Sequence, residues 1–145
     1  MARAHGVDHI VMYHAQPVAA AVREMTGGMG AHHAVDGIGG AMLAQTLDCV
    51  RPFGTVASVG QSAGPIPDLA VAELGPRRSI ALARPSVFAY AADEARYRQA
   101  AAAFLAELEQ GLRIAPGPSF PLAEAAAAHR ALEGRRTSGT PLLLC

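Results

Sequence analysis

Short apolar runs of β-type composition alternate along this chain with segments of helical periodicity, and this alternation restricts the fold more than any other feature. Such an order is typical of βαβ units, in which a helix connects two neighbouring parallel strands. The sequence therefore predicts an α/β fold with a mostly parallel sheet flanked by helices. The expected strands are residues 9–13, 31–36, 55–59, 79–83 and 141–145, and the expected helices are residues 17–26, 42–50, 69–74, 93–110 and 121–133.

Composition excludes several classes of protein. The 145 residues are 51% apolar and 17% charged, which suits one packed domain and argues against a disordered or fibrous chain. The formal net charge is zero and the arginines are scattered, so we expect no basic surface for nucleic acid or a membrane. Because the sequence contains no lysine, P-loop and Schiff-base lysine chemistry are excluded.

The cysteines and histidines show no pattern of a metal site or a disulfide framework. Cys49 and Cys145 lie far apart and match no zinc-finger spacing, and Cys49 falls on the core side of its expected helix. His32 and His33 would point to opposite faces of a strand, so they cannot chelate one metal ion together. No apolar run approaches the roughly 18 residues that cross a bilayer, and no signal peptide is recognisable, so we expect a cytoplasmic protein.

A glycine-rich turn follows the expected strand 31–36. The sequence from Gly37 to Met42, GIGGAM, nearly matches the dinucleotide fingerprint G-x-G-x-x-G, but Met42 stands where the third glycine belongs. No acidic residue lies about 20 positions further on to hold a ribose. A tight strand-to-helix turn is therefore the favoured interpretation, although the turn can still line a ligand crevice beyond the end of its strand.

A second motif, GQSAG at residues 60–64, matches the nucleophile-elbow pattern G-x-S-x-G of hydrolases. Asp93 and His129 follow Ser62 in the chain order that a catalytic triad needs. A nucleophile elbow requires a helix directly after the serine, whereas Pro65 follows closely and disfavours one. His129 also falls inside an expected helix, so hydrolysis is kept as a minor alternative.

Several segments occur in an order that is typical of one enzyme family. They are HIVMY (9–13), MTGGMG (25–30), VDGIGG (35–40), LDCVRPFG (47–54), VGQSAG (59–64), RPS (84–86) and AHRALE (128–133). In this order they resemble the C-terminal half of the NADPH:quinone oxidoreductases, the zeta-crystallin branch of the medium-chain dehydrogenase/reductase superfamily. That family transfers hydride without a catalytic zinc ion, so the resemblance implies no metal site.

The resemblance implies a Rossmann sheet that binds NADPH and assigns eight residues to the cofactor site. By resemblance, Tyr13 lies near the adenosine 2′-phosphate, and Asp36, Gly37 and Ile38 line the crevice. Gly60, Gln61 and Ser62 approach the nicotinamide half, and Ser86 and its neighbours complete that wall. No catalytic residue is expected in this chain. The G-x-S-x-G motif becomes a cofactor-side loop, which removes most of the case for a hydrolase.

The resemblance also implies that parts of such an enzyme lie outside this sequence. Residues 1–145 would be a truncated NADPH-binding domain that lacks the barrel-like catalytic domain, the first two Rossmann strands and the glycine-rich pyrophosphate turn. The strand near Ala34 should then have one bare edge. We also expect NADPH binding by the chain alone to be weak or absent, because the pyrophosphate turn supplies much of the affinity.

Two hypotheses from different classes remain. In the first, the chain is part of an oxidoreductase and needs a second polypeptide that carries the missing half. In the second, it is a non-catalytic remnant that serves as a dimerisation or binding module. Family members commonly dimerise by pairing the strand that is here Ser79 to Ala83 with its symmetry mate, so we expect a homodimer.

Overall fold

A computed structural model describes residues 2–145 and divides the chain into two compact units, Met1–Ala92 and Asp93–Cys145.

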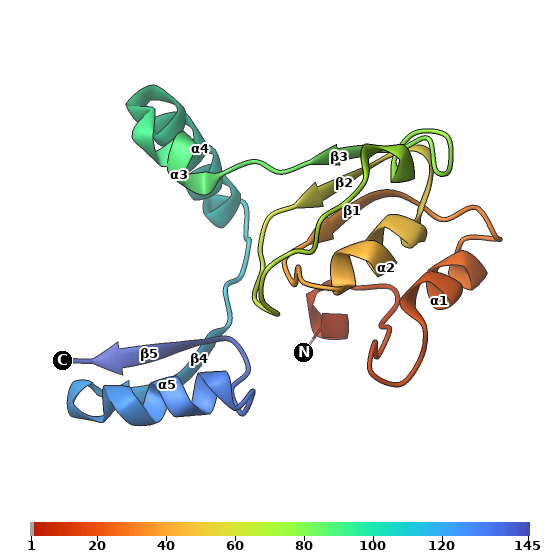
Figure 1. Ribbon diagram of the computed structural model, residues 1–145. Helices are drawn as coiled ribbons and strands as arrows, with labels where there is room; N and C mark the ends of the chain where they lie inside the picture. Colours follow the sequence, from red (N-terminus) through yellow and green to blue (C-terminus); the bar gives the residue numbers. More distant parts are fainter. Residues whose placement is uncertain (1) are drawn as a thin grey trace. The chain divides into compact units, whose positions relative to one another are not determined.

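A parallel three-stranded sheet forms the centre of the first unit (Figure 1). Its strands β1 (Ala31–Asp36), β2 (Val50–Ser58) and β3 (Ala81–Ala83) lie in the order β1-β2-β3, and both pairings are parallel. Helix α2 (Met42–Cys49) connects β1 to β2 and packs against both strands. Helix α1 (Val18–Met25) packs against α2. The unit is completed by η1 (Ala2–His5), η2 (Val71–Glu73) and α3 (Val87–Ala92).

The core of this unit lies between α2 and β2. Leu43 and Leu47 are four residues apart and therefore face the same side of α2, where they pack against Val50 and Val56. Leu47 is 1% exposed and Val56 is 0% exposed. Burial of each such side chain contributes about 1.5 to 3 kcal/mol. This small cluster fixes α2 on the sheet and, with it, the loops at both ends of β2.

The structure confirms the parallel α/β arrangement but corrects one predicted strand. Residues 9–13 form no strand; they lie in an irregular segment that ends in a turn at Tyr13. A β-strand needs a hydrogen-bonded neighbour, and no strand within residues 2–145 lies beside this segment. Within residues 2–145, β1 pairs with β2 alone, so β1 forms one edge of this sheet.

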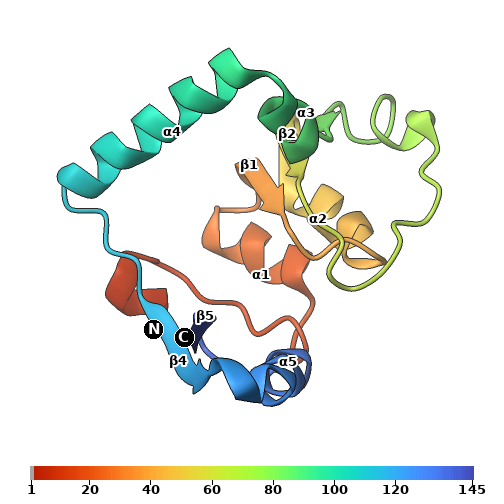
Figure 2. The same ribbon diagram turned by 90° about the vertical axis from the view of Figure 1, so that its left-hand side faces the viewer.

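The second unit contains a two-stranded parallel sheet and two helices (Figure 2). Helix α4 (Glu94–Glu109) begins at Asp93, whose carboxylate accepts a hydrogen bond from the Arg96 backbone amide at 3.1 Å. Strands β4 (Pro116–Pro121) and β5 (Thr140–Leu144) pair, and α5 (Ala125–Glu133), which follows η3 (Leu122–Glu124), packs against them. Strand β4 was not predicted, because Pro116, Gly117 and Pro118 are residues typical of turns.

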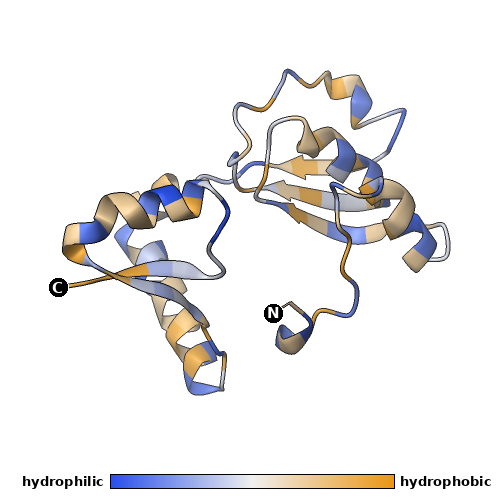
Figure 3. Cartoon of the chain, turned by 90° about the horizontal axis from the view of Figure 1, so that it is seen from below, coloured by the Kyte–Doolittle hydropathy of each residue, from blue (hydrophilic) through white to orange (hydrophobic). Residues whose placement is uncertain are grey.

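Large apolar side chains remain exposed in the second unit. Phe104 and Leu105 on α4 are 48% and 57% exposed, and Leu143 and Leu144 at the end of β5 are 40% and 57% exposed. Figure 3 shows the corresponding hydrophobic colouring along α4 and β5. Within residues 2–145, no helix combines the length and the apolar character that a membrane crossing requires.

Candidate functional site

Two loops lie against each other at the carboxyl ends of β1 and β2. The first follows Asp36 and the second follows Ser58, and their backbones are close enough to require glycine. A Cβ atom on Gly60 would lie 2.5 Å from the Gly37 carbonyl oxygen, and one on Gly39 would lie 2.6 Å from the Gln61 Cα atom. The sequence motifs GIGG and GQSAG therefore serve one contact, in which each loop leaves room for the other.

Hydrogen bonds between the two loops fix this contact. The Val59 amide donates to the Asp36 carbonyl oxygen at 2.8 Å, and the Ala63 amide donates to the Ile38 carbonyl oxygen at 2.8 Å. The Ser62 hydroxyl lies 3.4 Å from the Gly37 carbonyl oxygen, to which it donates. The loops thus form one surface at the sheet edge where open α/β proteins bind their ligands.

Asp36 organises the first loop from a buried position. Its side chain is 3% exposed, and Oδ1 accepts hydrogen bonds from the amides of Ile38 at 2.8 Å and Gly39 at 3.0 Å. Its second oxygen, Oδ2, is buried and has no hydrogen-bond partner within residues 2–145. A buried carboxylate oxygen normally has a donor, so this atom lacks a partner that its environment would usually supply.

An open depression of about 440 Å³ lies beside the second loop. It brings Gly60 and Gln61 together with Ser86, which follows β3. Arg84 begins the RPS segment but was not among the eight residues assigned to the site, and the structure gives it a role there. Its guanidinium donates to the Ser58 hydroxyl and to Gln61 Oε1, both at 2.9 Å, so it links the ends of β2 and β3. Its position directly before Pro85 and Ser86 was the available signal.

A second, smaller depression of about 180 Å³ lies beside the first loop. It contains Tyr13, Asp36, Gly37 and Ile38, with apolar side chains from α1 and α2. Tyr13 thus lies beside the carboxyl end of β1 although its segment is not a strand. Of the eight predicted residues, only Ser62 lines neither depression, and it still contacts Gly37.

The structure supports neither Ser62 nor Cys49 as a nucleophile. Residues 65–70 after Ser62 are irregular, so the helix of a nucleophile elbow is absent from this part of the chain. Cys49 is buried, donates a hydrogen bond from Sγ to the Gln45 carbonyl oxygen, and has its pKa raised by burial. A thiol with a raised pKa is a poor nucleophile, which agrees with a packing role for Cys49.

Comparison with known proteins finds relatives that match nearly the whole chain. The chain is 37% identical over 145 residues to a 2-haloacrylate reductase of Burkholderia, which is 99% of this chain and 44% of that protein. A crystal structure of quinone oxidoreductase from Pseudomonas syringae superposes with a TM-score of 0.89 at 30% identity, covering 99% of this chain and 45% of that one. The Escherichia coli quinone oxidoreductase complexed with NADPH gives a TM-score of 0.86 at 25% identity, with coverages of 97% and 44%. The chain therefore spans less than half the length of these relatives.

A family model described as zinc-binding dehydrogenase matches residues 5–140. Residues 2–145 bring no three His, Cys, Asp or Glu side chains together as a metal site would require, so we assign no zinc ligands in this chain. The sheet order, the paired loops and the relatives agree with one another. The chain belongs to the zinc-binding dehydrogenase family, and within it corresponds to the C-terminal, Rossmann-type portion of the quinone oxidoreductases of the medium-chain dehydrogenase/reductase superfamily.

Proposed function

We propose that residues 1–145 form part of the NADPH-binding domain of an enzyme that transfers hydride from NADPH to a quinone or enone. The observation that carries this proposal is the contact between the loops after β1 and β2, where Gly60 lies against Gly37. Relatives that share this arrangement of strands are quinone oxidoreductases, and one of them is complexed with NADPH. Bound NADPH would supply the hydride, and this chain's residues would orient it.

The residues at the two depressions fit the two halves of a dinucleotide. Near the first loop, Tyr13 offers a phenol beside the crevice, and the unpartnered Oδ2 of Asp36 can accept a hydrogen bond from a ligand hydroxyl. Near the second loop, Arg84 lies with Gly60 in the same depression and adds a positive charge next to Gln61. We assign the adenosine half to the Tyr13 side and the nicotinamide half to the wall formed by Gly60, Gln61, Ser62 and Ser86.

Binding by these residues alone should be weak. Residues 1–145 contain no complete G-x-G-x-x-G sequence, so the amides that usually hold the pyrophosphate are not supplied by such a turn. Each interaction between an anion and a helix N-terminus contributes about 0.3 to 1 kcal/mol, and up to about 2 kcal/mol when partly buried. Loss of several such interactions weakens a micromolar site toward the millimolar range, roughly 4 kcal/mol.

A second candidate function is that of a non-catalytic dimerisation or binding module. The bare edge of β1 and the outer edge of β3 favour it, because both expose backbone groups that can pair with another chain. In that case the chain would pair with another chain and would take no part in catalysis. We place either function in the cytoplasm, in agreement with the two unpaired cysteines, Cys49 and Cys145.

Titration calorimetry with NADPH and a quinone-dependent NADPH oxidation assay test the proposal on the purified chain. We expect heats that fit a dissociation constant in the millimolar range, lost in Gly60→Ala but kept in Gly75→Ala, because an added Cβ at Gly75 meets no atom within 4 Å. No turnover is expected from the chain alone, because the domain that excludes water from the nicotinamide is not among these residues. Micromolar binding or turnover without a partner would contradict the weak-binding proposal. Binding unaffected by Gly60→Ala would contradict the assigned site.

A further inference from the structure

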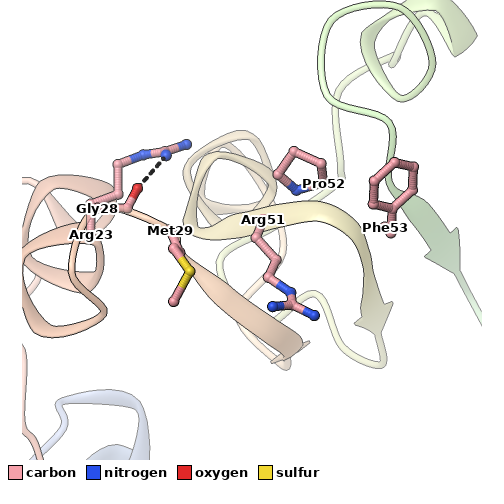
Figure 4. Close-up of a pocket in the computed structure, with 6 residues that line it drawn as sticks. All are labelled: Arg23, Gly28, Met29, Arg51, Pro52 and Phe53. Atoms are coloured by element: carbon pink, nitrogen blue, oxygen red, sulfur yellow. Dashed lines mark hydrogen bonds between the residues drawn. The ribbon is translucent and has the colours of Figure 1, made fainter.

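A shallow depression of about 470 Å³ lies at the opposite end of β2 from the paired loops (Figure 4). It is lined by Arg23, Gly28, Met29, Arg51, Pro52 and Phe53. Arg51 and Ser58 are separated by seven positions of an extended strand, which is on the order of 20 Å. The depression is therefore distinct from the proposed cofactor site and plays no part in it.

The charge of this depression is positive and is not balanced by its own lining. Two of the six lining residues are arginines and none is acidic. Arg23 is held by backbone carbonyl oxygens, donating to Gly28 at 3.4 Å and to Asp48 at 3.0 Å. Among residues 2–145, the structure shows no carboxylate paired with it. The structure of residues 2–145 likewise shows no hydrogen bond or ion pair to the Arg51 guanidinium. An anion would therefore find a cation available at Arg51.

Phe53 presents an aromatic ring to solvent in an unfavourable backbone conformation. Its φ is +66°, in a backbone region that residues other than glycine rarely adopt. A hydrogen bond from its amide to the Ser79 carbonyl oxygen, at 2.7 Å, holds it there. Its ring is 91% exposed, so it adds nothing to the core. Strain and exposure both oppose folding, and such strained positions cluster at ligand sites.

On the side of Met29, the backbone of the depression is closely packed. Gly30 follows Met29 with a φ of +91°, and a Cβ there would lie 2.8 Å from the Cys49 carbonyl oxygen. The turn before β1 is therefore pressed against the start of β2. In Figure 4 the Arg51 side chain is drawn between those of Met29 and Phe53. A flat apolar group in this depression could contact the side chains of Met29, Pro52 and Phe53. The Arg51 guanidinium would lie beside it.

We propose that this depression binds a small aromatic carboxylate, whose carboxylate accepts hydrogen bonds from Arg51 and whose ring packs against Phe53 and Pro52. The guanidinium group matches the planar, two-oxygen geometry of a carboxylate. The volume falls within the range of about 300 to 1,000 Å³ that is usual for small-molecule sites. The positive charge of the lining favours an anion, and the exposed Phe53 ring favours an anion that carries an aromatic ring.

Benzoate is the probe, and its binding to the complete chain can be followed by saturation-transfer NMR and by chemical shifts of backbone amides. We expect benzoate to shift the amides of residues 28, 29, 51, 53 and 54, and acetate or benzyl alcohol to do so much less. Arg51→Gln should weaken benzoate about tenfold, the effect of losing one charge-assisted hydrogen bond. Arg113→Gln, an exposed arginine of the second unit, is the matched control and should bind benzoate like the wild type.

Phe53→Gly separates a ligand role from a structural one. Glycine accepts a positive φ, so this variant should melt at a higher temperature than the wild type while binding benzoate several-fold more weakly. Equal benzoate affinity in Arg51→Gln and the wild type overturns the proposal, as does equal binding of acetate and benzoate. A Phe53→Gly variant that is both more stable and fully competent for benzoate also overturns it. None of these measurements depends on NADPH.

Discussion

Asp36 shows how a single buried side chain can serve both the fold and the site. Its Oδ1 atom holds two amides of the loop after β1, while its Oδ2 atom is left without a partner among residues 2–145. Asp36→Ala leaves both amides without an acceptor and should lower the free energy of unfolding by about 1 to 3 kcal/mol. Asp36→Asn keeps one oxygen acceptor and should cost much less. Urea unfolding of the two variants measures the difference, and equal losses would show that the hydrogen bonds to Oδ1 do not stabilise the loop.

Glu73 provides a pH-dependent contribution to stability. A hydrogen bond from Arg78, at 2.6 Å, lowers the pKa of Glu73 below its ordinary value of 4.5, and Arg77 lowers it further. A lowered pKa stabilises the fold fully above the ordinary value, and this contribution is lost as the pH falls through the lowered pKa. Glu73→Gln should therefore destabilise the protein at about pH 7, and the difference from the wild type should shrink near pH 3.

The matched control for Glu73 is Glu107→Gln on an exposed face of α4, for which the structure gives no ion pair. Its effect on the free energy of unfolding should be small at both pH values. Urea unfolding of the three proteins at each pH provides the comparison. A Glu73→Gln effect that stays constant down to the acidic pH would show that the contact with Arg78 contributes without depending on the charge of the carboxylate.

At the scale of elements, the loop after β2 depends on a glycine that no larger residue can replace. A Cβ on Gly60 would meet the Gly37 carbonyl oxygen and carbon at 2.5 and 3.0 Å, and both are backbone atoms that cannot rotate away. Gly60→Ala should therefore push the two loops apart and lower the free energy of unfolding by about 2 kcal/mol. Gly75→Ala should leave stability unchanged or raise it slightly. Thermal melts of both variants test this, and a Gly60→Ala protein as stable as the wild type would show that the loops can separate freely.

The elements also show what a sequence can and cannot predict. Helices α2, α4 and α5 were predicted because their periodicity and end signals are local, and β1 because a turn follows it directly. Residues 9–13 have the composition of a strand but no neighbouring strand within residues 2–145, whereas β4 has turn residues and is a strand because β5 pairs with it. Pairing between distant segments is not encoded in local composition.

The candidate site followed the same rule. Its glycines and Asp36 were recognised from motifs that are contiguous in the sequence. Arg84 was not, because its importance arises from hydrogen bonds to Ser58 and Gln61, more than 20 positions away. Likewise, no local sequence feature predicts that Phe53 adopts a positive φ, because its amide is held by the carbonyl oxygen of the distant Ser79.

At the scale of the whole molecule, the exposed edge of β3 is the feature that governs assembly. Strand β3 pairs with β2 on one side, and no strand within residues 2–145 covers its other side. We propose that two copies pair along this edge around a two-fold axis, which joins two three-stranded sheets into one and satisfies the free backbone groups of both edges. Such a contact is self-complementary, so it closes as a dimer and does not propagate.

Light scattering of the purified chain tests this assembly. A dimer is expected at tens of micromolar, roughly the concentration above which a dissociation constant of a few micromolar gives mostly dimer. Ala83→Lys places a charge on the exposed edge strand of both copies, where lysine opposes strand pairing, and should shift the population toward monomer. Ala103→Lys adds the same charge on the exposed side of α4 and should leave the dimer intact. A wild-type chain that stays monomeric at these concentrations, or an Ala83→Lys variant that dimerises as the wild type does, would rule out pairing through β3, and the bare edge of β1 would then be the remaining place for another chain to pair with the sheet.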